Sequence, residues 1–320
     1  MQYKLLNSRP IMDIQDTYTL RGICMLMIII HHVLKYAEWA PIPIRGIWGD
    51  MGTAVFFFIS GWGLYCSMEK KERVDFSYLW QNLKKLLIPF FVVWGCTELI
   101  FNIMHPDYGL LNILRDGIVL KYPSFTFKII HLWFIKAIVG VYIVSILTFI
   151  ITKNRLLRVS IVTFICLTYI LLGWKVLHLP QYVWGSIICF PAGMWLSAYR
   201  RELKLVLEQK WAIAIISLFL YWLFRNYDFL PLRACLKYSI PFCLLFVSMG
   251  SIVNIQSKWL YFIGKNSLLF YLIHIALLLL LRESEYVCEH YILTLCVVFI
   301  GTVAFSWMYI KVQELISARQ

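Results

Sequence analysis

The sequence predicts an all-α integral membrane protein, a bundle of about ten transmembrane helices with both termini in the cytoplasm. Hydrophobic residues make up 61% of the 320 residues and charged residues 15%, a more apolar composition than that of ordinary soluble domains. The apolar residues fall in blocks of about 17 to 22, the length that a helix needs to cross roughly 30 Å of hydrocarbon. The positive charges lie unevenly on the two sides of these blocks.

We expect ten spans, with a single polytopic membrane domain over residues 1–320 and no separate soluble domain. The spans are predicted at residues 20–38, 48–66, 84–104, 131–152, 156–174, 182–199, 211–226, 238–255, 260–281 and 290–311. Lys and Arg are about twice as frequent in the connections on the side of the N-terminus, which places that side in the cytoplasm. An even number of spans returns the C-terminus to the same side. We therefore expect a multi-pass protein of the cell (cytoplasmic) membrane.

The net charge of +13 does not indicate nucleic-acid binding. The basic residues interrupt apolar blocks and form no continuous stripe with interleaved aromatic residues. The nine cysteines are scattered and have no metal-binding spacing, so we expect no metal. The charge is better explained by the orientation of the chain in a membrane.

The first predicted span, "LRGICMLMIIIHHVLKYAEW" at residues 20–39, carries basic side chains within an apolar helix. His32 follows Arg21 by eleven positions, which is close to three turns and about 16 Å along a helix. The two side chains therefore share a face, with Arg21 at the cytoplasmic end and His32 deep inside, while His31 points about 100° away. Ionisable groups in membrane spans are costly and usually face an interior cavity.

Other ionisable residues are predicted inside the later spans. His274 in "YLIHIALLLLL" would lie about 20 Å from a helix start near residue 260, at a depth comparable to that of His32. It would share a cavity with His32 or make a hydrogen bond to a neighbouring helix. Glu98 and Lys136 would line the cavity or pair with buried partners. Trp133, at the outer start of the fourth span, is typical of an interfacial anchor.

Several stretches, taken in order, resemble the membrane-bound acyltransferase family 3, whose members O-acylate carbohydrates and other envelope molecules. The stretches are "LRGICMLMIIIHH", "FFFISGWGLYCS", "NLKKLLIPF", "HLWFIKAIVGVY", "FPAGMWLSAYR" and "IGKNSLLFYLIH". In the second of them, Gly61 and Gly63 are typical of close helix packing. Where family members often carry paired arginines before a proline, this chain has Lys84 and Lys85, which keep the charge without the planar arginine fork.

The resemblance implies a ten-helix bundle, cytosolic acyl-CoA as co-substrate, and essential roles for Arg21 and His32. Neutral imidazole suits a general base that takes a proton from an acceptor hydroxyl as the oxygen attacks a thioester. An acyl-histidine intermediate is the alternative. Arg21, Lys84 and Lys85 would bind the phosphates of the acyl-CoA. Candidates to line the cavity or the acceptor site are His31, Glu98, Trp133, Lys136, Tyr271 and His274.

The predicted function is therefore transfer of an acyl group, acetyl in the simplest case, from acyl-CoA to a hydroxyl of an envelope carbohydrate or glycolipid. No bound cofactor is expected, and the partners are membrane lipid, acyl-CoA and the acceptor. The alternative is a transporter or exporter of a small acid or a lipid-linked glycan, because buried His, Glu and Lys also suit a permeation path.

Overall fold

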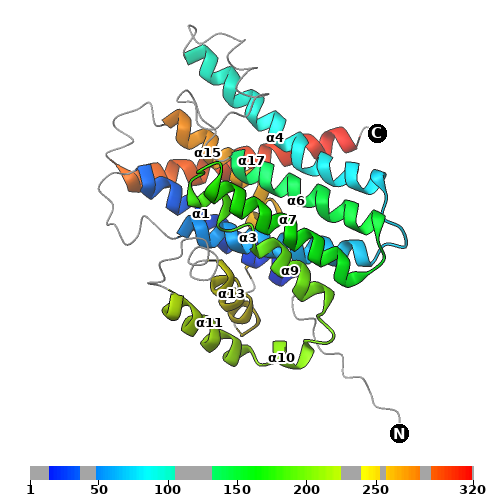
Figure 1. Cartoon of the computed structure of the whole chain (residues 1–320). Coiled ribbons are helices and arrows are strands. Elements are labelled where there is room, and N and C mark those ends of the chain that lie inside the picture. The colour runs from blue at the N-terminus through cyan, green and yellow to red at the C-terminus, as the bar shows by residue number, and fades with distance from the viewer. Residues whose placement is uncertain are drawn as a thin grey trace. The chain divides into compact units, whose positions relative to one another are not determined.

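The computed structural model describes residues 14–36, 48–104, 132–224, 239–252, 257–281 and 290–318. Every regular element in these ranges is a helix (Figure 1). The helices are α1 (Ile14–Tyr36), α3 (Trp48–Glu69), α4 (Phe76–Met104), α6 (Leu132–Ile151), α7 (Arg155–Lys175), α8 (Gln181–Trp184), α9 (Cys189–Ala198), α10 (Lys204–Glu208), α11 (Lys210–Phe224), α13 (Ile240–Ile252), α14 (Lys258–Lys265), α15 (Ser267–Leu281) and α17 (Tyr291–Ser317).

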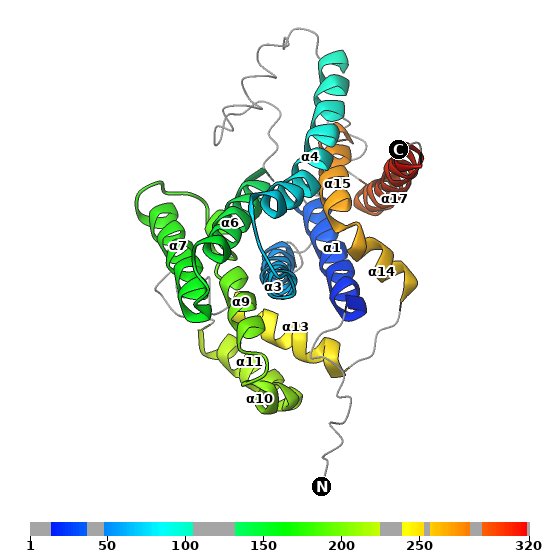
Figure 2. The same cartoon turned by 90° about the vertical axis from the view of Figure 1, so that its right-hand side faces the viewer.

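Contacts between the helices define two compact units, each assembled from three separate stretches of chain. Unit 1 contains the first half of α1, nearly all of α3, the end of α6 and the helices from α7 to α14. Within it, α11 packs along α13 and α7 packs against α9 (Figure 1). Unit 2 contains the second half of α1, α4, most of α6, α15 and α17. There, α15 contacts both α4 and α17 (Figure 2).

Five helices in the described ranges are long and apolar enough to cross a membrane, and a sixth span results if α14 and α15 are counted as one bent segment. The five are α1, α3, α6, α7 and α17. This agrees with a multi-pass membrane protein. The count of ten spans, the cytoplasmic position of both termini and the single domain stay predictions.

Helix α4 begins eight residues before the predicted start of its span at residue 84. The Asp75 side chain caps it by accepting a hydrogen bond of 2.9 Å from the Tyr78 N–H, which satisfies one of the N–H groups left open at a helix start. The added turns, which begin at Phe76, present an exposed Trp80 one turn before the exposed Lys84. Pro89 lies inside the helix and removes one N–H from its backbone ladder.

The span predicted at residues 182–199 is divided into α8 and α9. Pro180 precedes the first residue of α8, and Pro191 lies in the first turn of α9. Proline fits the first turn of a helix because the N–H groups there have no partner within the helix. The two prolines therefore mark the starts of two helices. The hydropathy pattern alone does not distinguish two short helices from one continuous span.

The span predicted at residues 260–281 is also divided, into α14 and α15, with a bend at the break. The carbonyl of Asn266 accepts from the Phe270 N–H at 3.1 Å, so Asn266 occupies the N-cap position of α15, which asparagine favours. The helix that carries His274 therefore starts at Ser267 and not near residue 260. His274 lies about 10 Å along α15, and the depth of about 20 Å predicted from one straight helix is wrong.

Two pairs of glycines allow helices of unit 1 to touch through their backbones. In the first pair, a Cβ atom on Gly61 of α3 would overlap the Phe190 carbonyl, and one on Gly193 of α9 would overlap the Phe58 carbonyl. Such close approach requires small residues, so the packing role predicted for Gly61 is confirmed. A Cβ on Gly63 would meet no atom of the described residues within 4 Å, and its packing role stays a prediction.

The second pair brings α14 against the first half of α1. A Cβ on Gly22 would overlap the Leu260 carbonyl, and one on Gly264 would overlap the Tyr18 carbonyl. Gly22 directly follows Arg21 in the sequence. The close crossing therefore fixes the backbone beside Arg21 within unit 1.

Candidate active site

Helix α1 carries both residues of the predicted catalytic pair. It is continuous from Ile14 to Tyr36, so the spacing of eleven residues between Arg21 and His32 is a helical spacing of about 16 Å. Arg21 lies in the half that belongs to unit 1 and is partly buried. His32 lies in the half that belongs to unit 2 and is 8% exposed.

A direct hydrogen bond joins His32 to His274 of α15 inside unit 2. Nδ1 of His32 is 2.9 Å from Nε2 of His274. The ring planes differ by 15° and the ring centroids are 5.2 Å apart. This is about the largest centroid separation that two imidazoles can have when a nitrogen of one is 2.9 Å from a nitrogen of the other. The rings therefore lie end to end and nearly coplanar, the arrangement that an N–H···N hydrogen bond favours.

His274 is also held by the backbone of its own helix. Its Nδ1 is 2.8 Å from the carbonyl oxygen of Phe270, one turn earlier in α15. The residue is fully buried. Phe270 was not among the predicted site residues, although a spacing of four along a predicted helix could have indicated it.

Aromatic rings extend from the histidine pair toward α6. Tyr271 contacts His274, with ring centroids 5.8 Å apart, and Phe134 of α6 lies 4.9 Å from Tyr271. Trp133 lies 5.9 Å from Phe134 and is 7% exposed. Trp133 is thus buried within the protein, which fits its alternative prediction as a residue that lines the site better than that of an anchor facing the lipid.

His31 occupies a different environment from His32. The His31 ring packs against Gly49 in the first turn of α3. The two are so close that a Cβ atom on Gly49 would overlap Cδ2 of His31. The ring also lies edge-on to His32, with centroids 5.3 Å apart. The difference in direction predicted for the two histidines therefore agrees with their packing.

Glu98 and Lys136 lie on other helices of unit 2. Glu98 is 6% exposed on α4, and Lys136 is partly buried on α6. Both make interactions inside the protein. The contacts above form one connected cluster within unit 2, and Glu98 and Lys136 lie on α4 and α6 of the same unit. The cluster contains His31, His32, Trp133, Phe134, Tyr271 and His274.

Arg21 lies near Tyr18, one turn earlier in the part of α1 that belongs to unit 1. Its guanidinium carbon is 6.0 Å from the centroid of the Tyr18 ring, and Tyr18 contacts Tyr261 of α14 edge-on at 5.2 Å. Nε of Arg21 is buried and has no hydrogen-bond partner among the described residues. A buried donor without a partner is costly, so this atom is suited to bind an anionic ligand group.

Lys84 and Lys85 are both exposed on α4 in unit 2. Nζ of Lys84 lies 5.3 Å from the centroid of the Trp80 ring, within the range of a cation–π contact. Arg21 belongs to unit 1. Joint binding of one ligand by Arg21 and these two lysines stays a prediction.

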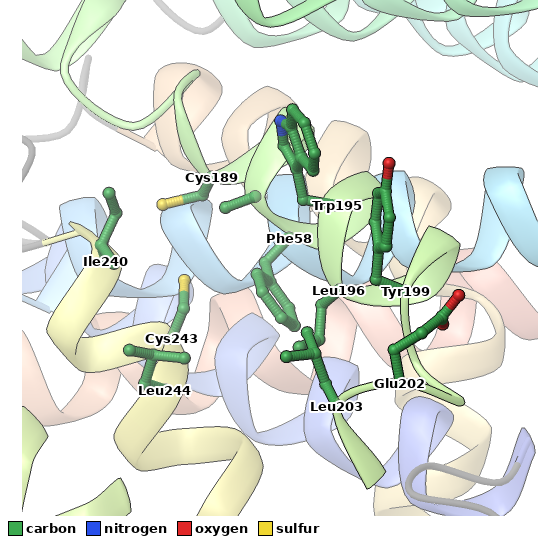
Figure 3. Close-up of a pocket in the computed structure, with 11 residues that line it drawn as sticks. Phe58, Cys189, Trp195, Leu196, Tyr199, Glu202, Leu203, Ile240, Cys243 and Leu244 are labelled. Atoms are coloured by element: carbon green, nitrogen blue, oxygen red, sulfur yellow. The ribbon is translucent and has the colours of Figure 1, made fainter. Parts of the chain in front are cut away.

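A cavity of about 380 Å³ lies within unit 1, between α9 and α13. Its walls are almost wholly apolar, and Cys189 of α9 and Cys243 of α13 lie near each other on its lining (Figure 3). Glu202 lies at its edge and pairs with Arg155 at 2.7 Å. The cavity contains none of the predicted site residues.

The fold is that of a multi-pass helical membrane protein. Its site contains the hydrogen-bonded pair His32 and His274, and a buried Nε of Arg21 that has no hydrogen-bond partner among the described residues. A family model described as an acyltransferase domain matches residues 19–311. The chain therefore belongs to the acyltransferase 3 family and is a membrane acyltransferase. No curated protein and no solved structure matches it significantly.

Proposed function

We propose that the protein transfers an acyl group, acetyl in the simplest case, from cytosolic acyl-CoA to a hydroxyl of a cell-envelope carbohydrate or glycolipid. The observation that carries this proposal is the hydrogen bond between buried His32 and His274. A thioester is already activated, so the reaction mainly needs a base for the acceptor hydroxyl. A buried neutral imidazole meets that need.

In the proposed reaction, His32 is the catalytic base. Its ring takes the proton from the acceptor hydroxyl while the oxygen attacks the thioester carbonyl. A C–O bond forms, and the C–S bond then breaks. The imidazolium returns its proton to the departing thiolate of CoA, so the histidine ends each cycle unchanged.

Arg21 binds the donor in this proposal. Its buried Nε, without a partner among the described residues, supports binding of a phosphate oxygen. The pantetheine arm then extends along α1 over the roughly 16 Å that separate Arg21 from His32. Lys84 and Lys85 are further candidates for binding donor phosphates through their positive charge.

Replacement of His32 by Gln tests the catalytic assignment. We expect kcat for acyl transfer from acetyl-CoA to fall about 10²- to 10⁴-fold, the usual contribution of a general base. The matched control is His178→Asn, because His178 is exposed and has a positive φ of 47° that asparagine tolerates. Equal activity of His32→Gln and the wild type, at equal protein level, would contradict the proposal.

The acceptor and the donor group are identified by mass spectrometry of envelope polysaccharide from cells with and without the gene. We expect an acyl ester that disappears on deletion and does not return with His32→Gln. The transporter alternative predicts a different result in liposomes, namely movement of substrate without consumption of acyl-CoA.

A further inference from the structure

The two histidines form a directional chain of hydrogen bonds that ends at a backbone carbonyl. We propose that His274 is a positioning residue, which holds His32 in the tautomer that carries its basic lone pair on Nε2. The inference rests on the proposed function only where it concerns the reaction. The arrangement of protons itself can be tested without substrate.

The direction of the chain is set at the Phe270 end. A carbonyl oxygen can only accept, so the contact of 2.8 Å requires the proton of His274 to be on Nδ1. In a neutral imidazole the other nitrogen then carries the lone pair. Nε2 of His274 is therefore an acceptor.

The ring of His32 is constrained in the same way by its neighbour. Nε2 of His274 accepts at 2.9 Å from Nδ1 of His32, so Nδ1 of His32 carries the proton. The lone pair of neutral His32 is then on Nε2. The backbone of α15 thus determines, through His274, which nitrogen of His32 acts as the base.

The chain also restricts where a proton can go after the hydroxyl is deprotonated. His32 becomes an imidazolium, and its Nδ1–H donates a stronger, charge-assisted hydrogen bond to His274. The Phe270 carbonyl at the far end does not take up a proton. The proton gained at Nε2 of His32 can return from that atom to the departing thiolate.

The tautomer can be measured by ¹⁵N NMR of the whole protein with labelled histidine in lipid nanodiscs. The chain has seven histidines, and the spectrum of His32→Gln assigns the His32 signals. We expect wild-type His32 to be protonated on Nδ1 and unprotonated on Nε2. Protonation of His32 on Nε2 would overturn the inference.

Three substitutions separate positioning from packing. His274→Gln keeps an acceptor oxygen near the position of Nε2, whereas His274→Asn is too short to reach His32 and His274→Leu has no acceptor. We expect His32 to keep the Nδ1–H tautomer only in the Gln variant. We expect kcat to fall about 10- to 100-fold in the Asn and Leu variants, with KM for acetyl-CoA unchanged, and to be largely rescued in the Gln variant.

The two proposals fail in different ways. If the wild type transfers no acyl group but His32 shows the expected tautomer and loses it in His274→Leu, the proposed function fails and the hydrogen-bond chain stands. If acyl transfer depends on His32 but kcat is equal in the Gln, Asn and Leu variants, the positioning role fails. An unchanged His32 tautomer in His274→Leu likewise overturns it.

Discussion

At the scale of single residues, the site depends on the hydrogen-bond partner of His32 as well as on His32 itself. His32 is recognisable because an ionisable group deep in an apolar helix is costly. Its partner His274 is recognisable for the same reason. The contact of 2.9 Å between them cannot be read from either stretch of sequence. The two residues are 242 positions apart, and only the packing of α1 against α15 brings them together.

Arg21 supports a prediction about donor recognition. Because arginine presents a planar fork and lysine a point charge, Arg21→Lys keeps the charge but loses hydrogen bonds to phosphate. We expect KM for acetyl-CoA to rise roughly 10- to 100-fold, the value of one or more charge-assisted hydrogen bonds. Steady-state kinetics on the purified protein in lipid measure this.

The control for Arg21→Lys is a truncated donor. Acetyl-pantetheine carries the thioester but none of the nucleotide phosphates. The wild type and the variant should therefore use it equally well. An equal loss with both donors would mean that Arg21 supports the fold or the chemistry rather than the phosphates.

At the scale of helices, boundaries follow local signals that hydropathy does not contain. Asp75 starts α4, Pro180 starts α8, and Asn266 starts α15. Each of these residues is a known helix-start signal, so the sequence held this information. The prediction at residues 156–174 agrees with α7, where Asn154 caps the helix by accepting from Leu157 N–H at 3.0 Å.

The glycine crossing of α3 and α9 supports a prediction about stability. Gly61→Leu forces a side chain into the Phe190 carbonyl, and overpacking of this kind typically costs about 1–3 kcal/mol. Gly140→Ala is the matched control, because no atom of the described residues lies within 4 Å of its added Cβ. We expect a lower melting temperature for Gly61→Leu alone, measured by thermal unfolding in detergent. Equal melting temperatures of the two variants would contradict the crossing.

At the scale of the whole molecule, orientation in the membrane follows from the distribution of positive charge. Because Lys and Arg favour the cytoplasmic side, we expect both termini there. A fluorescent protein that matures only in the cytoplasm, fused to either end, should be bright. An alkaline phosphatase that folds only outside, fused to the C-terminus, should be inactive. An active phosphatase at the C-terminus, together with a bright fluorescent protein at the N-terminus, would overturn the even number of spans.

The sequence by itself determined the all-helical membrane class, the family, and the ionisable residues at the centre of the site, because apolar length and the cost of buried charge are local properties. It did not determine that Trp133 is buried, that Gly61 lies at a helix crossing, or that His274 contacts both His32 and the carbonyl of Phe270. Only the tertiary structure decided these points, since each depends on which helix face meets which neighbour. The chemistry proposed for His32 therefore rests on a hydrogen bond between distant helices that packing alone creates.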